Sequence, residues 1–405
     1  MSKIRIGIIG GCGHVGLPLG VKFALAGFET VLVDVNERAV HTVNSGNFPF
    51  VEEGGNDELR QALELGLRAT CDRAECAEVN VFVFVTGTPV DEHLNPKVSE
   101  VLQIFSQYQE YFNPGALVIM RSTLFPGTME HLYRRLQENG HQVKFAFCPE
   151  RVSQGTALRE IQTLPQIVSA FDEESFQAAY RIFARIAPCV IRLTPLEAEV
   201  TKLMANAWRY VEFAIANQFY MIAESSGVDF QRIYQAIRYR YPRASGYKAP
   251  GFAAGPCLFK DTMQLASYFD HQFYLGHAAM LVNERLATFV VERASEKLGG
   301  TLWRKTIGLL GMTFKANNDD TRESLSFRVK KALEFRGAKT ICHDPYWPDS
   351  DSLEQVLTQA ELLILCTPHR DYESLAFSKP LVDVWGMFEQ TTIDVLPGFE
   401  GGAGG

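Results

Sequence analysis

The sequence predicts an α/β protein with two doubly wound parallel sheets joined by a helical region that contains one long helix. Two observations predict the sheets: short apolar runs alternate with helical patterns over residues 4–148, and the same alternation restarts near residue 301. Between them, residues 196–226 contain no Gly or Pro and keep helical spacing throughout. We therefore expect three domains, at residues 1–194, 195–300 and 301–405.

The composition is that of a globular chain. Of its 405 residues 46% are hydrophobic, and 39 basic against 47 acidic residues give a net charge of −8, which offers no general attraction to nucleic acid or an anionic membrane. No apolar run approaches the roughly 18 residues of a membrane span, and a strand pattern begins at Lys3, where a signal peptide would need a long apolar core. Eight scattered cysteines form no C-x-x-C pair and no zinc spacing. We expect a cytoplasmic protein with reduced thiols, no metal, and no nucleic-acid or membrane partner.

The first domain opens with a dinucleotide fingerprint. A strand over residues 4–10 leads into Gly11-Cys12-Gly13-His14-Val15-Gly16, a helix over 17–26 and a strand over 30–33 that ends at Asp34. In a Rossmann-like fold the pyrophosphate lies on the helix N-terminus, and an acidic residue accepts hydrogen bonds from the ribose. Asp34 therefore favours NAD over NADP, although Arg38 lies close enough to weaken that inference. The expected cofactor contacts here are Gly11, Gly13, His14, Val15, Gly16 and Asp34.

Three further strands follow, over residues 79–85, 116–120 and 143–148. Ligands of open parallel sheets bind at the carboxyl ends of the strands. Polar residues that follow these strands are therefore expected to ring one crevice, with the threonines near the cofactor: Thr86, Thr88, Thr123 and Glu150. The alternative for each threonine is a helix cap or a turn hydroxyl.

The long helix has four polar residues at intervals of three, four and three: Glu199, Lys202, Asn206 and Arg209. Such spacing puts them on one helical face. A solvated charged stripe is the alternative. Asn206 argues against it, because Asn is a poor residue for an exposed helix interior.

Residues 250–261 form the stretch in which we expect the chemistry. Two Gly and two Pro make a loop around Cys257, and the apolar pattern predicts that a helix begins at Thr262. Cys257 would lie near a helix N-terminus beside Lys260, and both favour the nucleophilic thiolate. Burial as a small hydrophobic residue is the alternative. Just upstream, residues 239–248 alternate basic and aromatic side chains, which suits an anionic ligand with a ring or a protein contact.

The third domain repeats the start of the first. Residues 307–311, Ile-Gly-Leu-Leu-Gly, echo residues 6–10, Ile-Gly-Ile-Ile-Gly, and further strands are expected over 339–342, 361–366 and 381–384. A polar segment over residues 315–324 follows the first strand, where a ligand loop is expected.

Six motifs together resemble the UDP-glucose/GDP-mannose dehydrogenase family, in the same order and over essentially the whole chain. They are Gly11 to Pro18 with Asp34; Ser122-Thr123 with Pro126-Gly127-Thr128; Pro149-Glu150-Arg151-Val152; Lys202-Leu203-x-x-Asn206; Cys257-Leu258-x-Lys260-Asp261; and Gly311-x-x-Phe314-Lys315 through Asp320-x-Arg322-Glu323-Ser324.

The resemblance implies NAD-dependent four-electron oxidation of the carbon-6 alcohol of a nucleotide sugar to a carboxylate. Cys257 would form a thiohemiacetal and then a thioester. Lys202 and Asn206 would stabilise the oxyanion, Lys202 and Asp261 are the acid/base candidates, and Thr123 and Glu150 would position or activate water. The resemblance also implies a homodimer through the long helix, with Arg243 reaching the partner's site.

The implied substrate contacts point in two directions. Arg151, Val152 and Arg209 resemble the branch that acts on UDP-N-acetylhexosamines, particularly UDP-N-acetylmannosamine, whereas the Cys257 motif is similar to the glucose branch. We favour UDP-glucose, with UDP-N-acetylmannosamine or a dTDP-sugar as alternatives. The implied substrate contacts are Glu150, Arg151, Val152, Lys202, Asn206, Arg209, Arg243, Tyr247, a glycine at position 254 and Lys315, and Arg322 is implied as a cofactor or diphosphate contact.

Two other classes of function fit parts of the pattern. A two-electron hydroxyacid or acyl-CoA dehydrogenase also pairs a Rossmann-like domain with helices, but needs neither the thiol nor a third domain. A catalytically inactive regulator that binds NAD and a nucleotide sugar would have no use for the nucleophile Cys257.

Overall fold

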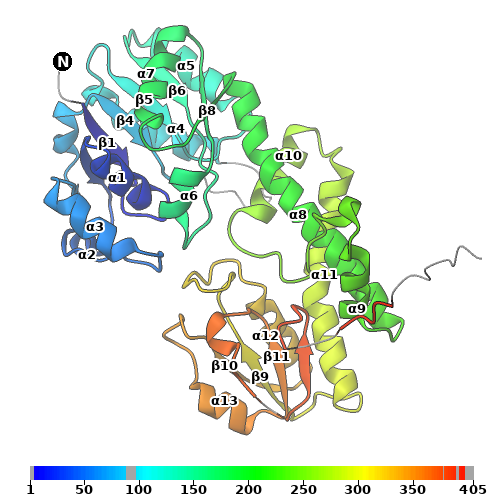
Figure 1. Cartoon of the computed structure of the whole chain (residues 1–405). Helices are drawn as coiled ribbons and strands as arrows, with labels where there is room; N and C mark the ends of the chain where they lie inside the picture. The colour runs from blue at the N-terminus through cyan, green and yellow to red at the C-terminus, as the bar shows by residue number, and fades with distance from the viewer. Residues whose placement is uncertain (1–3, 88–96, 377, 389–391, 397–405) are drawn as a thin grey trace, which may run out of the picture. The chain divides into compact units, whose positions relative to one another are not determined.

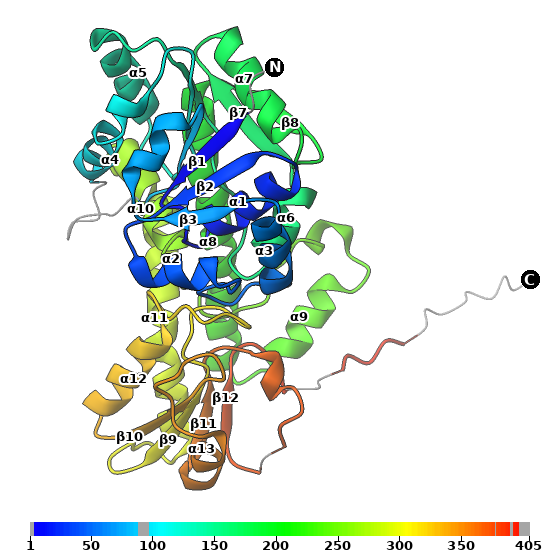
Figure 2. The same ribbon diagram turned by 90° about the vertical axis from the view of Figure 1, so that its left-hand side faces the viewer.

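The chain forms two parallel sheets, one in each of two compact units. The computed structural model describes residues 4–87, 97–376, 378–388 and 392–396. The first unit contains Met1–Trp208, Pro256–His277 and Asn317–Asp320, and the second contains Arg209–Gly255, Ala278–Ala316 and Thr321–Gly405. Helices lie on both faces of each sheet (Figures 1 and 2).

The sheet of the first unit has the strand order β3-β2-β1-β4-β5-β6-β7-β8. All neighbours are parallel except β6 and β7, which are antiparallel. The first six positions follow the doubly wound order of dinucleotide-binding folds. The strands are β1 (Arg5–Ile9), β2 (Glu29–Val33), β3 (Arg68–Thr70), β4 (Val81–Phe84), β5 (Leu117–Met120), β6 (Lys144–Phe147), β7 (Gln166–Ala170) and β8 (Val190–Leu193).

Alternating side chains of these strands supply two cores. In β4, Val81 and Val83 pack on one face, and Phe82 and Phe84 on the other. This is the period of two expected of a strand covered on both sides. The helices of this unit are α1 (Gly16–Leu25), α2 (Glu37–Asn44), α3 (Gly55–Glu64), α4 (Val98–Ser106), α5 (Thr128–Glu138), α6 (Ala157–Thr163), α7 (Glu173–Phe183) and α10 (Leu258–Tyr268), with short 3-10 turns at Arg73–Glu78 and Gln109–Tyr111.

The second unit has a four-stranded parallel sheet in the order β10-β9-β11-β12. In β11, Leu362 and Ile364 face one core, and Leu363 and Leu365 the other. The strands are β9 (Thr306–Leu310), β10 (Lys339–His343), β11 (Leu362–Leu365) and β12 (Leu381–Asp383). The helices are α9 (Phe230–Arg238), α12 (Ser326–Phe335) and α13 (Leu353–Gln359), with 3-10 turns at Pro242–Ala244 and Arg370–Tyr372, and α8 (Pro195–Ser225) and α11 (Tyr274–Lys297) each have residues in both units.

The predicted fold class is confirmed: two Rossmann-like sheets and a helical region with a helix of 31 residues. Two details differ from the expectation. The first sheet is not wholly parallel, and α10 begins at Leu258 rather than at Thr262. The earlier start was hidden because Asp261 looks like a surface residue but is buried against another helix. Among the described residues, no helix is long and apolar enough to cross a membrane.

Candidate active site

Cys257 is the N-cap residue of α10 and is exposed. Its carbonyl oxygen accepts a hydrogen bond from the backbone N–H of Asp261 at 2.9 Å, so the first turn of the helix starts directly at the thiol residue. The exposure rules out the alternative of a buried small hydrophobic residue. Cys257 thus lies at a helix N-terminus, and a thiolate there stays a prediction.

A buried amide–carboxylate hydrogen bond joins the long helix to α10. Asn206 Nδ2 donates to Asp261 Oδ2 at 2.6 Å, and the two residues are 7% and 1% exposed. The other carboxylate oxygen, Asp261 Oδ1, has no hydrogen-bond partner among the described residues, and Lys260 Nζ lies 4.0 Å from it. A buried acceptor without a partner is costly in a resting protein, so this oxygen is a candidate for contact with a ligand.

Three of the four polar residues on the predicted face of α8 are buried. Glu199, Lys202 and Asn206 are 1%, 9% and 7% exposed, whereas Arg209 is exposed. The solvated-stripe alternative is therefore wrong for the first three. The same stretch of α8 packs on α10 through Leu203, which contacts Leu265 in a small apolar cluster. Asn206 and Asp261 thus belong to one buried helix–helix contact, and Lys202 is buried on the same stretch of α8.

Glu150 lies after β6 in a buried ion pair with Arg121. Arg121 Nε donates to Glu150 Oε2 at 2.9 Å, and Nη2 contacts the same oxygen. Glu150 Oε1 accepts from the N–H groups of Arg151 and Val152 at 2.7 and 3.0 Å. Both oxygens are occupied, so the geometry suits positioning better than proton abstraction. The sequence analysis did not identify Arg121, although a charged residue at the end of an apolar strand was the available signal.

The threonines expected around the crevice lie at the ends of β4 and β5. Ser122, beside Thr123, donates its hydroxyl to the carbonyl oxygen of Thr86 at 2.5 Å, which ties the two strand ends together. Thr123 and Thr86 are both half-buried. The same loop contacts α10, because the rings of Phe125 and Tyr268 lie edge to face with centroids 5.9 Å apart. Thr88 lies outside the described residues.

The glycine loop between β1 and α1 fits a dinucleotide. A Cβ on Gly11 would lie 2.7 Å from Leu32 Cβ, and a Cβ on Gly16 would lie 2.7 Å from the carbonyl oxygen of Gly10, so both positions admit only glycine. A Cβ on Gly13 would meet nothing closer than 3.8 Å, which leaves this backbone open to a ligand. The observation matches the roles of the glycines in the fingerprint, and the residues therefore fit NAD.

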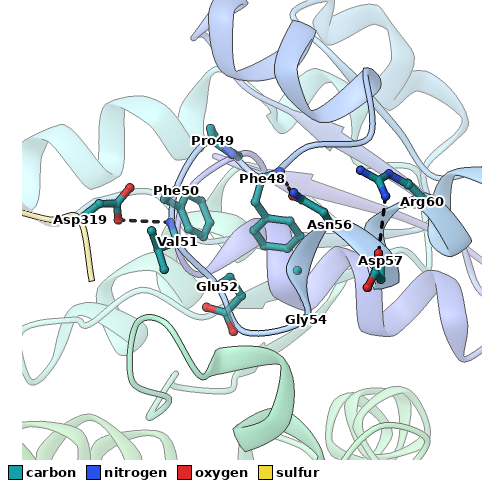
Figure 3. A pocket seen from close by; sticks show the side chains of 11 residues that line it. Phe48, Pro49, Phe50, Val51, Glu52, Gly54, Asn56, Asp57, Arg60 and Asp319 are labelled. Carbon is teal, nitrogen blue, oxygen red and sulfur yellow. Dashed lines mark hydrogen bonds and ion pairs between the residues drawn. The ribbon is translucent and has the colours of Figure 1, made fainter. Parts of the chain in front are cut away.

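Asp34 is held at the same loop. Its Oδ2 accepts from the N–H of Cys12 at 2.9 Å and its Oδ1 from the N–H of Asn36 at 3.0 Å, yet it is only half-buried. His14 lies against Phe50, with ring centroids 4.0 Å apart. Phe50 also lines an open pocket of about 660 Å³ beside α3 (Figure 3), an aromatic neighbour of the cofactor loop that the sequence analysis did not find.

The expected substrate contacts of the second unit are spread over several elements. Arg209, Arg243 and Arg322 are exposed, and Lys315 is half-buried. Tyr247 packs beside Tyr234 with its hydroxyl buried, and burial raises the pKa of that hydroxyl to about 12. The expectation of a glycine at position 254 is wrong, because the residue is Ala254. The roles of all these residues remain predictions.

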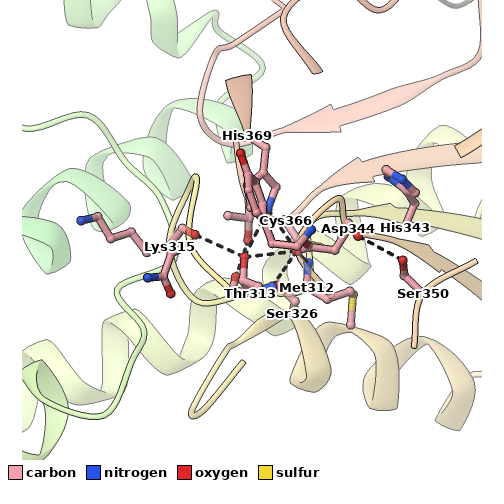
Figure 4. Close-up of polar contacts among 12 residues, drawn as sticks. Met312, Thr313, Lys315, Ser326, His343, Asp344, Ser350, Cys366 and His369 are labelled. Atoms are coloured by element: carbon pink, nitrogen blue, oxygen red, sulfur yellow. Dashed lines mark hydrogen bonds and ion pairs between the residues drawn. The ribbon is translucent and has the colours of Figure 1, made fainter. Parts of the chain in front are cut away.

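A buried carboxylate that the sequence did not reveal supports the loop before Lys315. Asp344 Oδ2 accepts from the N–H groups of Met312 and Thr313 at 2.6 and 2.8 Å and lies 3.0 Å from His369 Nε2 (Figure 4). Burial raises the pKa of Asp344, but hydrogen bonds from His369 and the two backbone groups outweigh it and lower the pKa to about 2. The Thr313 hydroxyl in turn donates to the carbonyl oxygen of Lys315 at 3.2 Å.

Three successive parts of the chain match the domains of one known protein family. Residues 4–187 match the NAD binding domain of the UDP-glucose/GDP-mannose dehydrogenase family, residues 196–285 its central domain, and residues 308–390 its UDP binding domain. The chain is 31% identical over 386 residues to a UDP-N-acetyl-D-mannosamine dehydrogenase of Pyrococcus horikoshii, covering 92% of this chain and 91% of that protein.

Solved structures agree with this placement. A UDP-D-ManNAc dehydrogenase from Pyrococcus horikoshii superimposes with a TM-score of 0.85 at 30% identity, covering 92% of this chain and 91% of the other. A UDP-glucose dehydrogenase from Pyrobaculum islandicum gives a TM-score of 0.87 at 26% identity, covering 95% and 94%. With all three domains matched, the chain belongs to the UDP-glucose/GDP-mannose dehydrogenase family and is an NAD-dependent nucleotide-sugar dehydrogenase.

Proposed function

We propose that this enzyme oxidises the carbon-6 alcohol of a UDP-N-acetylhexosamine, with UDP-N-acetylmannosamine as the first candidate, to the carboxylate. The observation that supports the reaction most directly is the Asn206–Asp261 hydrogen bond, which joins the helix of Lys202 to the helix capped by the exposed Cys257. The cation and the amide then share α8, the nucleophile and the carboxylate share α10, and the hydrogen bond joins the two helices that carry the set a covalent aldehyde oxidation needs.

The reaction needs two hydride transfers, and NAD supplies the hydride acceptor for both. In the first, the alcohol loses a proton to a base and a hydride from carbon 6, which gives an aldehyde. The Cys257 thiolate then adds to the carbonyl carbon to form a thiohemiacetal. Loss of a second hydride and of the hydroxyl proton gives a thioester, which water cleaves to the acid and the free thiol.

Lys202 and Asn206 act on the oxygen of the reacting carbon. One helical turn separates them, so both donors can reach the same oxyanion. We assign Asp261 Oδ1 as the acceptor of the alcohol proton. This oxygen is buried and has no hydrogen-bond partner among the described residues. Thr123 and Glu150 position the water that cleaves the thioester, since both oxygens of Glu150 already accept hydrogen bonds.

The choice of sugar departs from the expectation of UDP-glucose. The relatives that match over nine-tenths of the chain include UDP-N-acetyl-D-mannosamine dehydrogenases of two archaea, at 31% and 29% identity. Arg151, Val152 and Arg209 also resemble that branch. UDP-glucose is the second candidate, because of the Cys257 motif and the UDP-glucose dehydrogenase structure at 26% identity.

The test is the number of NADH molecules formed per sugar, with UDP-N-acetylmannosamine, UDP-N-acetylglucosamine, UDP-glucose and dTDP-glucose as substrates. Two NADH on the first sugar, and little on the others, is the expected result. Cys257→Ala should abolish acid formation, whereas Cys189→Ser, at another exposed cysteine, should not. One NADH with a stable carbonyl product would overturn the four-electron mechanism, and tight binding without turnover would favour the regulator.

We also propose that α8 pairs two copies of the chain. Its apolar side chains recur at intervals of three, four or seven residues on an exposed face, as in a helix–helix interface. They are Met204, Trp208, Ile215, Phe219 and Ile222, each between 45% and 64% exposed. Light scattering should give the mass of a dimer, and Trp208→Glu with Phe219→Glu should give a monomer. A wild-type monomer would contradict this proposal.

The division at residues 194 and 300 stays a proposal as well. It is supported by the ends of the family matches, which leave residues 188–195 and 286–307 between domains. The two compact units cut across it, because α8 and α11 each belong partly to both.

A further inference from the structure

Glu199 is a buried carboxylate on α8, one turn before Lys202. It is 1% exposed, and both of its oxygens accept backbone hydrogen bonds from a different element. Oε2 accepts from the N–H of Gly127 at 2.7 Å, and Oε1 from the N–H of Met129 at 2.8 Å. The carboxylate therefore joins the long helix to the start of α5.

The start of α5 has no cap of its own. Gly127 occupies the N-cap position and has no side chain that could accept the first N–H groups of this 11-residue helix. A carboxylate is the best partner for such groups, because it satisfies the donors and complements the positive end of the helix dipole. Glu199 supplies this cap from a helix about 70 residues further along the chain.

The capped segment continues directly from the loop that contains Thr123. That loop is fixed at three places: at the end of β4 by the Ser122 hydroxyl, at α10 by the contact of Phe125 with Tyr268, and at α8 by Glu199. The last connects it to the helix of Lys202 and Asn206, where Ala198 also belongs to the same apolar cluster as Leu124 and Met129. Among these contacts Glu199 supplies the polar one, through both of its carboxylate oxygens.

We propose that Glu199 is a positioning residue for the oxidation, holding the Thr123 loop against the helix of Lys202 and Asn206. This rests on the proposed function, and it adds to that function a residue that touches neither substrate nor cofactor. Positional errors near 1 Å at reacting groups cost up to about a hundredfold in rate. A residue that fixes the loop should therefore affect turnover more than substrate binding.

The charge state of Glu199 should make its effect on the enzyme depend on pH. Burial raises the pKa of Glu199 to about 7; the N–H groups of Gly127 and Met129 oppose the rise, and Glu130 on α5 adds to it. Above that pH the carboxylate accepts both N–H groups, and below it one oxygen becomes a donor. A cavity of about 460 Å³ lies beside Glu199. Among the described residues that line it, two others are titratable, namely Glu130 on α5 and Tyr268 on α10.

Ionisation of Glu199 affects stability and loop positioning in opposite directions. Because the pKa of Glu199 is raised in the folded state, its stabilising form is the neutral one, and that stability is lost as the pH rises through about 7. Glu199→Gln removes the buried charge but keeps only one acceptor for two N–H groups, so these opposing effects should leave only a small net change in melting temperature at pH 8.

The experiment measures kcat, KM and melting temperature of Glu199→Gln and Glu199→Asp between pH 6 and 9, with the sugar that gives NADH. Hydrogen exchange of peptides spanning residues 121–129 supplies a readout without activity. Glu197→Gln is the matched control, since Glu197 accepts the N–H of Thr194 at 2.8 Å at the exposed start of the same helix.

We expect about a tenfold or greater fall in kcat for Glu199→Gln, KM values within about threefold, faster exchange in residues 121–129, and loss of a rate limb near pH 7. An unchanged kcat, unchanged exchange, or loss of the fold in both variants would overturn the inference. Absence of NADH with the wild-type protein counts against the proposed function alone, because the exchange measurement still tests Glu199.

Discussion

The two Rossmann-like sheets place a carboxylate at the same position and put it in opposite environments. In each sheet the first strand is followed directly by a glycine with positive φ, Gly10 at 81° after β1 and Gly311 at 90° after β9. An aspartate follows the neighbouring strand and accepts a loop N–H two residues beyond that glycine: Asp34 from Cys12 and Asp344 from Thr313. The two sheets thus share this arrangement of strands and also one hydrogen bond from a loop N–H to an aspartate.

The loops around the two aspartates differ. Asp34 is half-buried and lies beside Gly11 and Gly13, so backbone and carboxylate remain accessible to a ligand. Asp344 has a side chain that is 0% exposed, because Thr313 and His369 cover it. The fold therefore sets the position of the aspartate, whereas the loop residues determine whether its carboxylate is accessible to a ligand or buried as a support of the loop.

The largest effect that this comparison predicts is on stability. Asp344→Ala should lower the free energy of unfolding of the second unit by about 3–5 kcal/mol, since it leaves the N–H groups of Met312 and Thr313 buried without an acceptor. Urea unfolding followed by the fluorescence of Trp347 and Trp385 measures it. Asp34→Ala should cost under about 1 kcal/mol; equal losses would refute the distinction.

The second prediction concerns acid. The pKa of Asp344 is lowered from 3.8 to about 2, so its ionised form stabilises the fold at pH values above about 4. That stability, about 2–3 kcal/mol, should be lost as the pH falls toward 2. Unfolding titrations between pH 5 and 2 should show the slope in the wild-type protein. Finding the same slope in Asp344→Asn would rule out this carboxyl as its source.

The third prediction tests the accessible acid. Asp34→Ala should lower kcat/KM for NAD about 10- to 100-fold, the value of a hydrogen bond to a charged group, with the melting temperature nearly unchanged. Discrimination against NADP should shrink, because a 2′-phosphate no longer meets a negative charge. Steady-state kinetics with both cofactors measures it, and Glu37→Gln, at an exposed carboxylate nearby, is the control. An unchanged KM for NAD would remove Asp34 from the cofactor site.

Much of the fold was predictable because its strands are continuous apolar runs and its long helix lacks Gly and Pro. The strands predicted over residues 30–33 and 339–342 differ from β2 and β10 by one residue. The antiparallel β7 was not predictable, since the direction of a strand depends on its partner. Nor was the start of α10, because only the contact with Asn206 shows that Asp261 is buried.

The candidate site was predictable where a motif has a fixed backbone geometry, as in the glycine loop, and Cys257 was predicted near a helix N-terminus but not as its cap residue. Partners far apart in the sequence were not. Arg121 meets Glu150 across 29 residues, and Glu199 meets Gly127 across 72. In both cases the charged residue could be read from the sequence but its partner could not, because tertiary packing alone brings them together.

The smallest predicted effect concerns a single methyl group in the glycine loop. A Cβ at Gly13 would have 3.8 Å to its nearest atom, so Gly13→Ala should change the free energy of unfolding by less than about 1 kcal/mol. Gly11→Ala should cost more, about 1–3 kcal/mol, because its Cβ would lie 2.7 Å from Leu32 Cβ. Yet Gly13→Ala should raise the KM for NAD severalfold, since its methyl group would stand where the pyrophosphate approaches the backbone. At the equivalent position after Gly311 the second sheet has Phe314 in place of a glycine. If Gly13→Ala bound NAD normally, the open backbone at Gly13 would not explain why the first loop binds the cofactor. The accessible carboxylate of Asp34 alone would then have to explain it.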